Sequence, residues 1–288
     1  MSHFIYTFGK ILPGFVFPLL LASCVSLKGV REFAETATAN VAHYNELGYS
    51  FLDHCEDRCR VEAIRTLDIQ LELSCSCDLY SKADSVTGIF YTTIYDYLKG
   101  LGELAGKDLT SYQTDRVFEA LSAEQYGPVS INESEAGAYA ALSNLLSDVA
   151  LTGFRKKKIA QYLEEANAPL QTLLGKFQML ISKDLKGELR FKKARLYSQY
   201  KDMMMGRTLD SDFENQSAVR TYYLSLKEIE KKEKLLDVYA KSLNEIAKGH
   251  QKLYDERNQL SLKELTQSLL GYSEEIQKLY QEFNQLNR

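Results

Sequence analysis

The sequence predicts an all-α protein, an elongated bundle of about five to seven helices. The 288 residues include four prolines, and two of these lie within the first 18 positions. Proline disrupts helix interiors, whereas Leu, Lys, Glu, Gln and Ala, which fill long runs of this chain, favour them. From about residue 30 the apolar residues recur at spacings of three and four, the period of an amphipathic helix. Together these three observations favour long helices that share one apolar core.

The clearest helical pattern covers residues 219–260. One set recurs every seven residues: Tyr222, Ile229, Leu236, Leu243 and His250. A neighbouring set widens the stripe: Leu226, Tyr239, Ala240, Ile246, Ala247, Leu253 and Tyr254. A stripe this wide is typical of a bundle helix. Because His250 lies on it, we expect a hydrogen-bonded core histidine rather than a metal ligand.

Two sequence signals mark the ends of this pattern. Ser211 and Glu214 have the spacing of a capping box, in which the Ser oxygen accepts an early helix N–H and the Glu reaches back. Gly206 lies just before it, where a preceding helix can end in a left-handed residue. Ser261 and Glu264 repeat the box, so a break is expected near 258–261.

Further helices are expected over about 30–58, 83–106 and 134–205. The sequence Asn167-Ala168-Pro169 interrupts the last of these ranges. Since proline suits the first turn of a helix, we expect a new helix to begin there.

Residues 67–77 differ from the rest. Leu67, Ile69, Leu71, Leu73, Cys75 and Cys77 alternate with polar residues. A period of two is the pattern of a half-buried strand. The helical surroundings and the lack of a clear partner strand favour helix instead, so a short extended segment remains an alternative here.

The N-terminal segment indicates a route out of the cytoplasm. Residues 11–23 are largely apolar and follow Lys10. The run is too short to span a bilayer, which needs about 20 apolar residues, but it has the length of a signal-peptide core. It ends in Leu21-Ala22-Ser23-Cys24. This segment resembles the signal peptides of bacterial lipoproteins, in which the cysteine of such a lipobox carries the acyl chains.

The resemblance implies three parts: a signal peptide over 1–23, a lipidated N-terminus and tether over 24–30, and a helical domain over 31–288. Cys24 would be the lipidation site and the membrane would be bound through its lipid. Val25 is not the Asp associated with inner-membrane retention, which implies the outer membrane. The alternative is an ordinary cleaved signal or an N-terminal hydrophobic helix, with Cys24 an unmodified thiol.

The other four cysteines lie within 23 residues: Cys55, Cys59, Cys75 and Cys77. Disulfides persist in exported proteins. We therefore expect two bridges that join the 55–59 segment to the 75–77 segment, each closing a loop of roughly 16 to 22 residues and contributing about 3 kcal/mol. The alternatives are redox-active thiols or a thiolate zinc site, for which the neighbouring His54 is a further candidate ligand. The spacing alone does not fix the pairing.

Charge and motifs narrow the functional classes. Residues 1–150 hold 10 Lys and Arg against 20 Asp and Glu, and residues 151–288 hold 25 against 19. This distribution lacks the concentrated basic face that is typical of nucleic-acid-binding proteins, so we expect no nucleic-acid partner. The run Arg155-Lys156-Lys157-Lys158 is a candidate anion-binding site, although a solvated helix face is the favoured explanation. No metalloprotease, nucleophile-elbow or P-loop motif occurs, so we expect no catalysis, cofactor or resident metal.

These observations predict a non-enzymatic envelope lipoprotein that binds or scaffolds another envelope component through a helical surface. Two alternatives stay open. One is a metal-binding or thiol-redox protein that uses the cysteine cluster. The other is an envelope immunity or inhibitor protein that uses the acidic first half against a basic target.

Overall fold

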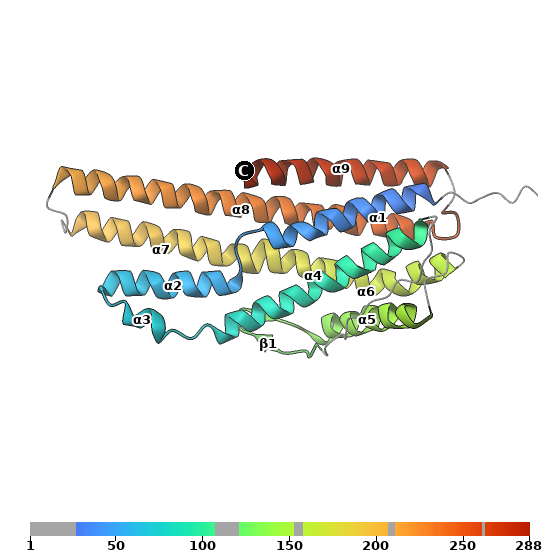
Figure 1. The fold of residues 1–288 in the computed structure, drawn as a ribbon, viewed down its shortest axis with the longest axis horizontal. Coiled ribbons are helices and arrows are strands. Elements are labelled where there is room, and N and C mark those ends of the chain that lie inside the picture. Colours follow the sequence, from blue (N-terminus) through green and yellow to red (C-terminus); the bar gives the residue numbers. More distant parts are fainter. Residues whose placement is uncertain (1–26, 107–120, 153–157, 207–210, 261–262) are drawn as a thin grey trace, which may run out of the picture.

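The protein is an elongated rod of helices in a computed structural model (Figure 1), which confirms the predicted all-α class. The structure describes residues 27–106, 121–152, 158–206, 211–260 and 263–288. The lipobox and Cys24 lie outside these ranges.

Helices account for nearly all of the described elements. The first half contains α1 (Lys28–Val41), a 3-10 helix (Ala42–Glu46), α2 (Phe51–Thr66), α3 (Gln70–Leu73), α4 (Asp78–Ala105) and the two strands β1 (Gln125–Tyr126) and β2 (Val129–Ser130). The second half contains α5 (Glu133–Thr152), α6 (Ile159–Met179), a π-helical turn (Leu180–Leu185), α7 (Lys186–Met205), α8 (Asp212–Asp255) and α9 (Lys263–Asn287). The strands pair antiparallel in a hairpin with a turn at Gly127, whose φ is +59°.

Helix α8 runs almost the whole length of the rod, about 66 Å at 1.5 Å per residue. The predicted stripe is confirmed over its second half, where Ile229, Leu236, Leu243 and His250 are buried. The predicted capping box is also confirmed: Ser211 accepts from the Glu214 N–H, and the Glu214 carboxylate accepts from the Ser211 N–H. Helix α8 ends at Asp255 and α9 begins at Lys263, so the helical pattern is interrupted where the sequence predicts it.

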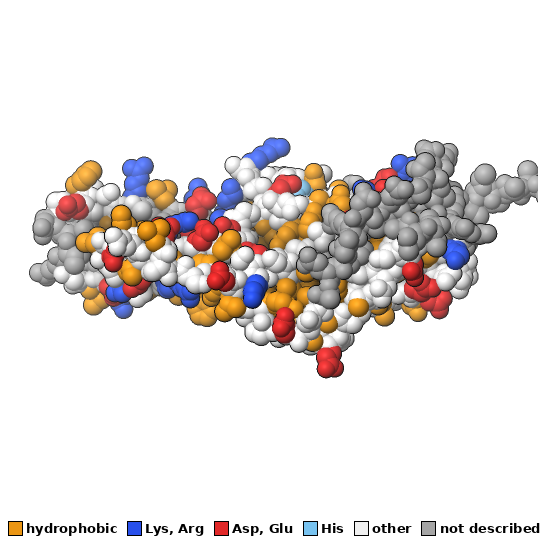
Figure 2. All heavy atoms as spheres, turned by 60° about the horizontal axis from the view of Figure 1, so that its bottom comes forward, with side chains coloured by type: hydrophobic (Ala, Val, Ile, Leu, Met, Phe, Trp, Pro, Cys, Tyr) orange, Lys and Arg blue, Asp and Glu red, His pale blue; other side chains and the backbone are white. Residues whose placement is uncertain are grey.

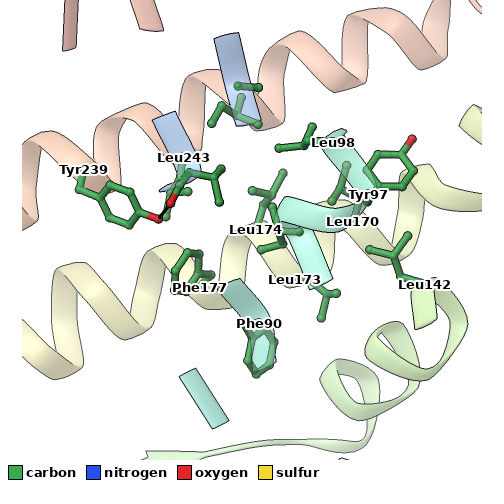
Figure 3. Close-up of a cluster of buried hydrophobic side chains, with 14 of the residues drawn as sticks. Phe90, Tyr97, Leu98, Leu142, Leu170, Leu173, Leu174, Phe177, Tyr239 and Leu243 are labelled. Carbon is green, nitrogen blue, oxygen red and sulfur yellow. Dashed lines mark hydrogen bonds between the residues drawn. The ribbon is translucent and has the colours of Figure 1, made fainter. Parts of the chain in front are cut away.

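The main core lies in the half of the rod where α1, α6 and α9 pack on α8, α4 packs on α1 and α6, and α5 packs on α6. Figure 3 shows side chains from α4, α5, α6 and α8 converging on one another. Each of those labelled is buried: Phe90, Tyr97, Leu98, Leu142, Leu170, Leu173, Leu174, Phe177, Tyr239 and Leu243. The Tyr239 hydroxyl donates to the Val41 carbonyl, 2.9 Å away, so even the polar atom of this ring is satisfied.

The other half of the rod is a thinner arm of α2, α3, α7 and the first part of α8 (Figure 1). We call the end of this arm, where α2 and α7 end and α8 begins, the distal end. The opposite end, where α1 begins, is the proximal end. Because α1 begins at Lys28, residues 28–30 of the expected tether belong to the first turn of the bundle, with Gly29 and Val30 buried.

The expected helix over 30–58 is divided into α1 and α2. Gly48 has φ +60°, a left-handed conformation that favours glycine, and it lies in the connection that shifts the chain from the line of α1 to that of α2 (Figure 1). Ser50 then caps α2 by accepting from the Asp53 N–H. Asp84 of α4 accepts from the N–H groups of Phe51 and Leu52, both at 2.9 Å, and so fixes the start of α2 against α4.

The expected interruption at Asn167-Ala168-Pro169 is wrong, because α6 continues through Pro169. An interior proline costs a helix about 3 kcal/mol. Leu163, Leu170 and Leu174 bury their side chains on the core side of α6. Each such burial stabilises by about 1.5–3 kcal/mol, so the three burials together exceed the cost of the proline. The range 134–205 is instead divided between α5 and α6 and by the π-helical turn.

The extended alternative for residues 67–77 is also wrong. Leu67, Ile69 and Leu73 are 92%, 83% and 88% exposed, so the alternation creates no buried face. Leu67 takes a left-handed φ of 54° that ends α2. Asp68 then accepts from the Gln70 N–H at the start of α3. Gly206 does end α7, but with a right-handed backbone rather than the expected left-handed one.

The closest approach between α1 and α8 occurs at Gly249. A Cβ added there would lie 2.2 Å from the Phe33 ring. We expect Gly249→Ala to lower the free energy of unfolding by about 1–3 kcal/mol, since overpacking forces the buried ring to shift. The matched control is Gly271→Ala in α9, where nothing lies within 4 Å of the added Cβ. Helix propensity predicts that this control stabilises by up to about 1 kcal/mol. Urea unfolding distinguishes the two, and equal effects would contradict the close approach.

Candidate functional site

The four cysteines of the 55–77 cluster meet at one place beside α2. Cys55 and Cys59 are one helical turn apart on α2, and Cys75 and Cys77 flank Ser76 in the turn between α3 and α4. The structure joins Cys55 to Cys77 and Cys59 to Cys75, with Cα–Cα distances of 5.8 and 6.1 Å. Both bridges connect the two segments, as the sequence analysis expects, and the pairing that the spacing left open is nested.

The two bridges are close enough to form a single cluster. All four sulfur atoms lie within 4.8 Å of one another, and the Cys59 and Cys77 Sγ atoms, which belong to different bridges, are 3.9 Å apart. Cys55 and Cys59 are buried, and Cys75 and Cys77 are half-buried. The same four atoms could therefore serve as two disulfides or, in the reduced protein, as one set of metal ligands.

His54, which the sequence analysis weighs as a further ligand, faces away from this cluster. Its Nε2 lies 2.9 Å from the Glu188 carboxylate on α7, and its Nδ1 lies 3.0 Å from the Tyr49 hydroxyl. A neutral imidazole with the proton on Nε2 satisfies both contacts, donating to Glu188 and accepting from Tyr49. His54 is therefore a clamp between α2 and α7. No local sequence signal could reveal it, because its partner Glu188 comes from a distant helix.

An open groove lies between α2 and α7, directly over the Cys59–Cys75 bridge. Its volume is about 540 Å³, and three arginines line it: Arg58 and Arg65 from α2, and Arg195 from α7. Arg65 pairs with Glu62 on its own helix. Arg58 and Arg195 form no ion pair with another described residue, so the groove keeps cationic groups beside the sulfur atoms.

The structure describes only the end of the candidate anion-binding run. Arg155, Lys156 and Lys157 lie outside the described residues, and Lys158 is exposed immediately before α6. A second group of basic residues lies on α7, where Lys192 pairs with Asp57 of α2 and Lys193 pairs with Glu230 of α8. These lysines therefore hold the arm together. Of the acidic first half, on which the inhibitor alternative depends, residues 1–26 and 107–120 lie outside the described ranges.

The distal end exposes an unusual set of apolar side chains. All but two of the large apolar residues exposed in the described chain belong to it or to the adjoining arm: Ile64, Leu67, Ile69, Leu73, Leu79, Phe191, Tyr197, Met205, Phe213, Val219, Tyr223 and Leu224. The two others are Leu270 and Tyr280 on α9. Figure 2 shows hydrophobic side chains exposed among charged ones at this end of the rod.

Tyrosines concentrate between α7 and α8 within this surface. A shallow groove of about 180 Å³ has a lining of Tyr197, Tyr200, Met204, Val219, Tyr222 and Tyr223. On the same two helices, the exposed cations Arg190, Lys201, Arg220 and Lys227 form no ion pair with another described residue. Tyr222, which the stripe assigned to the core, is only half-buried. The 3.6-residue period could not reveal this, because the partner helices end before they reach it.

A second polar site is buried in the core. His250 accepts from the Tyr97 hydroxyl at Nε2 (2.7 Å), and its Nδ1 lies 3.0 Å from the Asn167 side-chain oxygen. These partners define a neutral imidazole that donates from Nδ1. Burial lowers the pKa of His250 to about 3. The prediction of a hydrogen-bonded core histidine is confirmed, and Asn167, where a new helix is expected to begin, is its acceptor.

Comparison with known proteins adds no functional assignment. No family model matches the chain, and neither a curated protein nor a solved structure matches it. Within the described ranges, no helix combines the length and the apolar character needed to cross a membrane.

The buried histidine predicts how stability depends on pH. The unfolded chain binds a proton at His250 near pH 6.5, whereas the folded chain does so only near pH 3. Between these values the unfolded state binds more protons, so the free energy of unfolding falls as the pH falls, by up to ~1.4 kcal/mol per pH unit from this group. We expect His250→Gln to remove that part of the slope between pH 4 and 6.

Chemical unfolding at several pH values measures this slope. Tyr97→Phe is the matched control, because it removes the hydroxyl donor but keeps the buried imidazole. It should lose stability at pH 7 and retain the steep pH dependence. A His250→Gln variant with the slope of the unsubstituted protein would show that His250 does not titrate as described.

Proposed function

We propose that the protein is a non-enzymatic lipoprotein of the bacterial cell envelope, anchored through Cys24, that binds another envelope component with its distal end. The membrane is bound by the lipid, and the outer membrane is the location that Val25 favours. The rod holds the binding surface at a distance from the anchored end.

The anchor is supported by the sequence and by where the bundle starts. The lipobox Leu21-Ala22-Ser23-Cys24 follows an apolar core of signal-peptide length. The first described helix begins at Lys28, only four positions after Cys24. A lipid on Cys24 would therefore attach close to the proximal end. Stable anchoring takes more than one acyl chain, which a lipoprotein cysteine supplies.

The observation that carries the binding proposal is where the exposed apolar side chains gather. Soluble monomers rarely expose contiguous apolar patches of this kind without an interaction to explain them. Phe213 and Met205, at the start of α8 and the end of α7, are 81% and 73% exposed. Tyrosine is enriched among the residues that dominate binding energy, and Tyr197 and Tyr223 are both more than half exposed.

The contrast between the two ends strengthens this argument. Near the proximal end, α1, α4, α6, α8 and α9 bury one continuous core, and Leu265, Leu269 and Ile276 of α9 cover it. Toward the distal end α8 has α7 as its neighbour, and the outward stripe of α8 stays uncovered. A partner that supplies the missing helix face would complete the packing there.

The anchor makes the first prediction of this proposal. Expressed from its own start codon in a Gram-negative host, the protein should incorporate an alkyne-tagged fatty acid and sediment with membranes. Cys24→Ser should abolish the label and leave the protein uncleaved or soluble. Intact mass of the purified chain should match residues 24–288 plus acyl chains. A chain of unmodified mass, or label retained by Cys24→Ser, would contradict the anchor.

The second prediction of this proposal concerns the binding surface at the distal end. A photo-crosslinking amino acid at Tyr223 should give one discrete adduct in intact cells, whereas the same group at Leu270 of α9 should give none. Tyr197→Ser combined with Leu224→Ser should abolish that adduct. Because these side chains are exposed, the double variant should unfold within about 0.5 kcal/mol of the unsubstituted protein. Adducts of equal yield at both positions, or an adduct that survives the double variant, would overturn the distal surface.

A further inference from the structure

We propose that the cysteine cluster has a second state: when both disulfides are reduced, Cys55, Cys59, Cys75 and Cys77 bind one zinc ion. The proposal goes beyond the anchoring and binding function and does not depend on it. In either state the cluster ties α2 to the turn that precedes α4.

The positions of the sulfur atoms carry the proposal. In a tetrahedral site with Zn–S distances of about 2.3 Å, neighbouring sulfurs lie roughly 3.8 Å apart. The Cys59 and Cys77 sulfurs already have this separation, 3.9 Å, and all four sulfurs lie within 4.8 Å of one another. Once the two S–S bonds break, small side-chain rotations are enough to open a space for the ion at the centre of the cluster.

The backbone around the cluster favours the same result. Cys55 and Cys59 are four residues apart on α2, which places both sulfurs on one face of a helix whose start is fixed by Ser50 and Asp84. Cys75 and Cys77 lie on the turn before α4, and Asp84 belongs to α4 itself. The contacts that hold the two ligand pairs opposite each other do not involve the disulfides. The ligands are therefore brought together in advance, which lowers the cost of binding the ion.

The charges nearby suit a four-thiolate zinc centre, whose net charge is −2. The Arg58 Nη2 lies 3.7 Å from the Cys55 Sγ and forms no ion pair with another described residue. Arg195 lines the groove over the cluster from the side of α7. Cationic groups of this kind lower the pKa of a thiol and favour the thiolate that zinc requires. No carboxylate is part of the cluster among the described residues.

The groove also gives a reductant access. Cys59 and Cys75 both belong to its lining, and Cys75 is only half-buried. A water-soluble phosphine breaks each S–S bond, two thiols form, and the phosphine becomes its oxide with the oxygen of one water molecule. When Zn²⁺ then binds, four S–H bonds lose their protons to the buffer and four Zn–S bonds form. Zinc itself undergoes no redox change.

The test uses residues 24–288 with Cys24→Ser, purified from an oxidising compartment so that the remaining cysteines start as disulfides. The protein is reduced with the phosphine, freed of it under argon, and mixed with Zn²⁺ or Co²⁺. We expect one zinc per chain in native mass spectra of the reduced protein and none in the oxidised protein. Co²⁺ should give the intense visible absorption of a tetrahedral thiolate site.

A matched variant separates this site from adventitious binding. Cys59→Ser with Cys75→Ser keeps the Cys55–Cys77 bridge and leaves only two thiols after reduction. Its zinc affinity, measured by competition with a chromophoric chelator, should fall at least ~100-fold, since both of its remaining positions need other ligands. Equal affinity in the variant would place the zinc elsewhere and overturn the proposal.

Thermal unfolding covers the case in which the reduced protein is unstable. One equivalent of zinc should raise the unfolding temperature of the reduced chain and leave that of the oxidised chain unchanged. If reduction alone unfolds the protein, zinc should restore its helical circular dichroism. A reduced chain that binds well below one zinc, or that zinc neither stabilises nor refolds, shows that the cluster serves only as two disulfides.

Discussion

The burial of one long helix, α8, organises the whole molecule. Its second half is covered by α1, α6 and α9, and the contacts with α1 and α6 have polar or steric features that fix their register. Gly249 lets the Phe33 ring of α1 reach the α8 backbone, and His250 connects α8 to Asn167 of α6. Tyr239 donates to the last carbonyl of α1, that of Val41. A core of leucines alone would tolerate sliding, but a buried glycine contact and paired polar groups allow one alignment.

The arm is held by different forces. Its interior is thin, and cross-links between elements replace hydrophobic volume: the two disulfides, the His54–Glu188 contact and the pairs that Lys192 and Lys193 make with α2 and α8. Exposed ion pairs contribute little, typically below 1 kcal/mol each. The covalent links and the buried histidine clamp therefore dominate. This division explains how the distal end can expose Phe213 and Tyr223 without unfolding, since the structure does not rely on these side chains for its stability.

Sequence periodicity predicted the fold class and the buried face of α8 because one rule, apolar residues every three to four positions, governs both. Sequence-based prediction failed where tertiary packing outweighed a local sequence preference. Pro169 did not end α6, because the burial of the leucines on either side of it stabilises the helix by more than the interior proline costs. The alternation at 67–77 gave no strand, because alternation needs a partner strand and a core, and that segment has neither. The cysteine cluster was predictable from its spacing within the chain. The pairing of the cysteines could not be predicted, because their spacing allows more than one connectivity. The groove and the role of His54 could not be predicted either, because Arg195 and Glu188 come from a helix more than 100 positions away.

The π-helical turn between α6 and α7 has a geometric consequence for the distal end. Leu180, Ile181 and Leu185 keep this turn buried, and Lys186, the residue after it, contacts Asp237 of α8. A π turn holds one residue more than an α turn, so it rotates everything that follows by about 100° around the helix axis. The side of the helix on which Tyr197, Tyr200 and Met204 lie is therefore decided about three to five helical turns before them. The buried π turn therefore determines which side of the rod the tyrosines face, and substitutions around the tyrosines do not change that side.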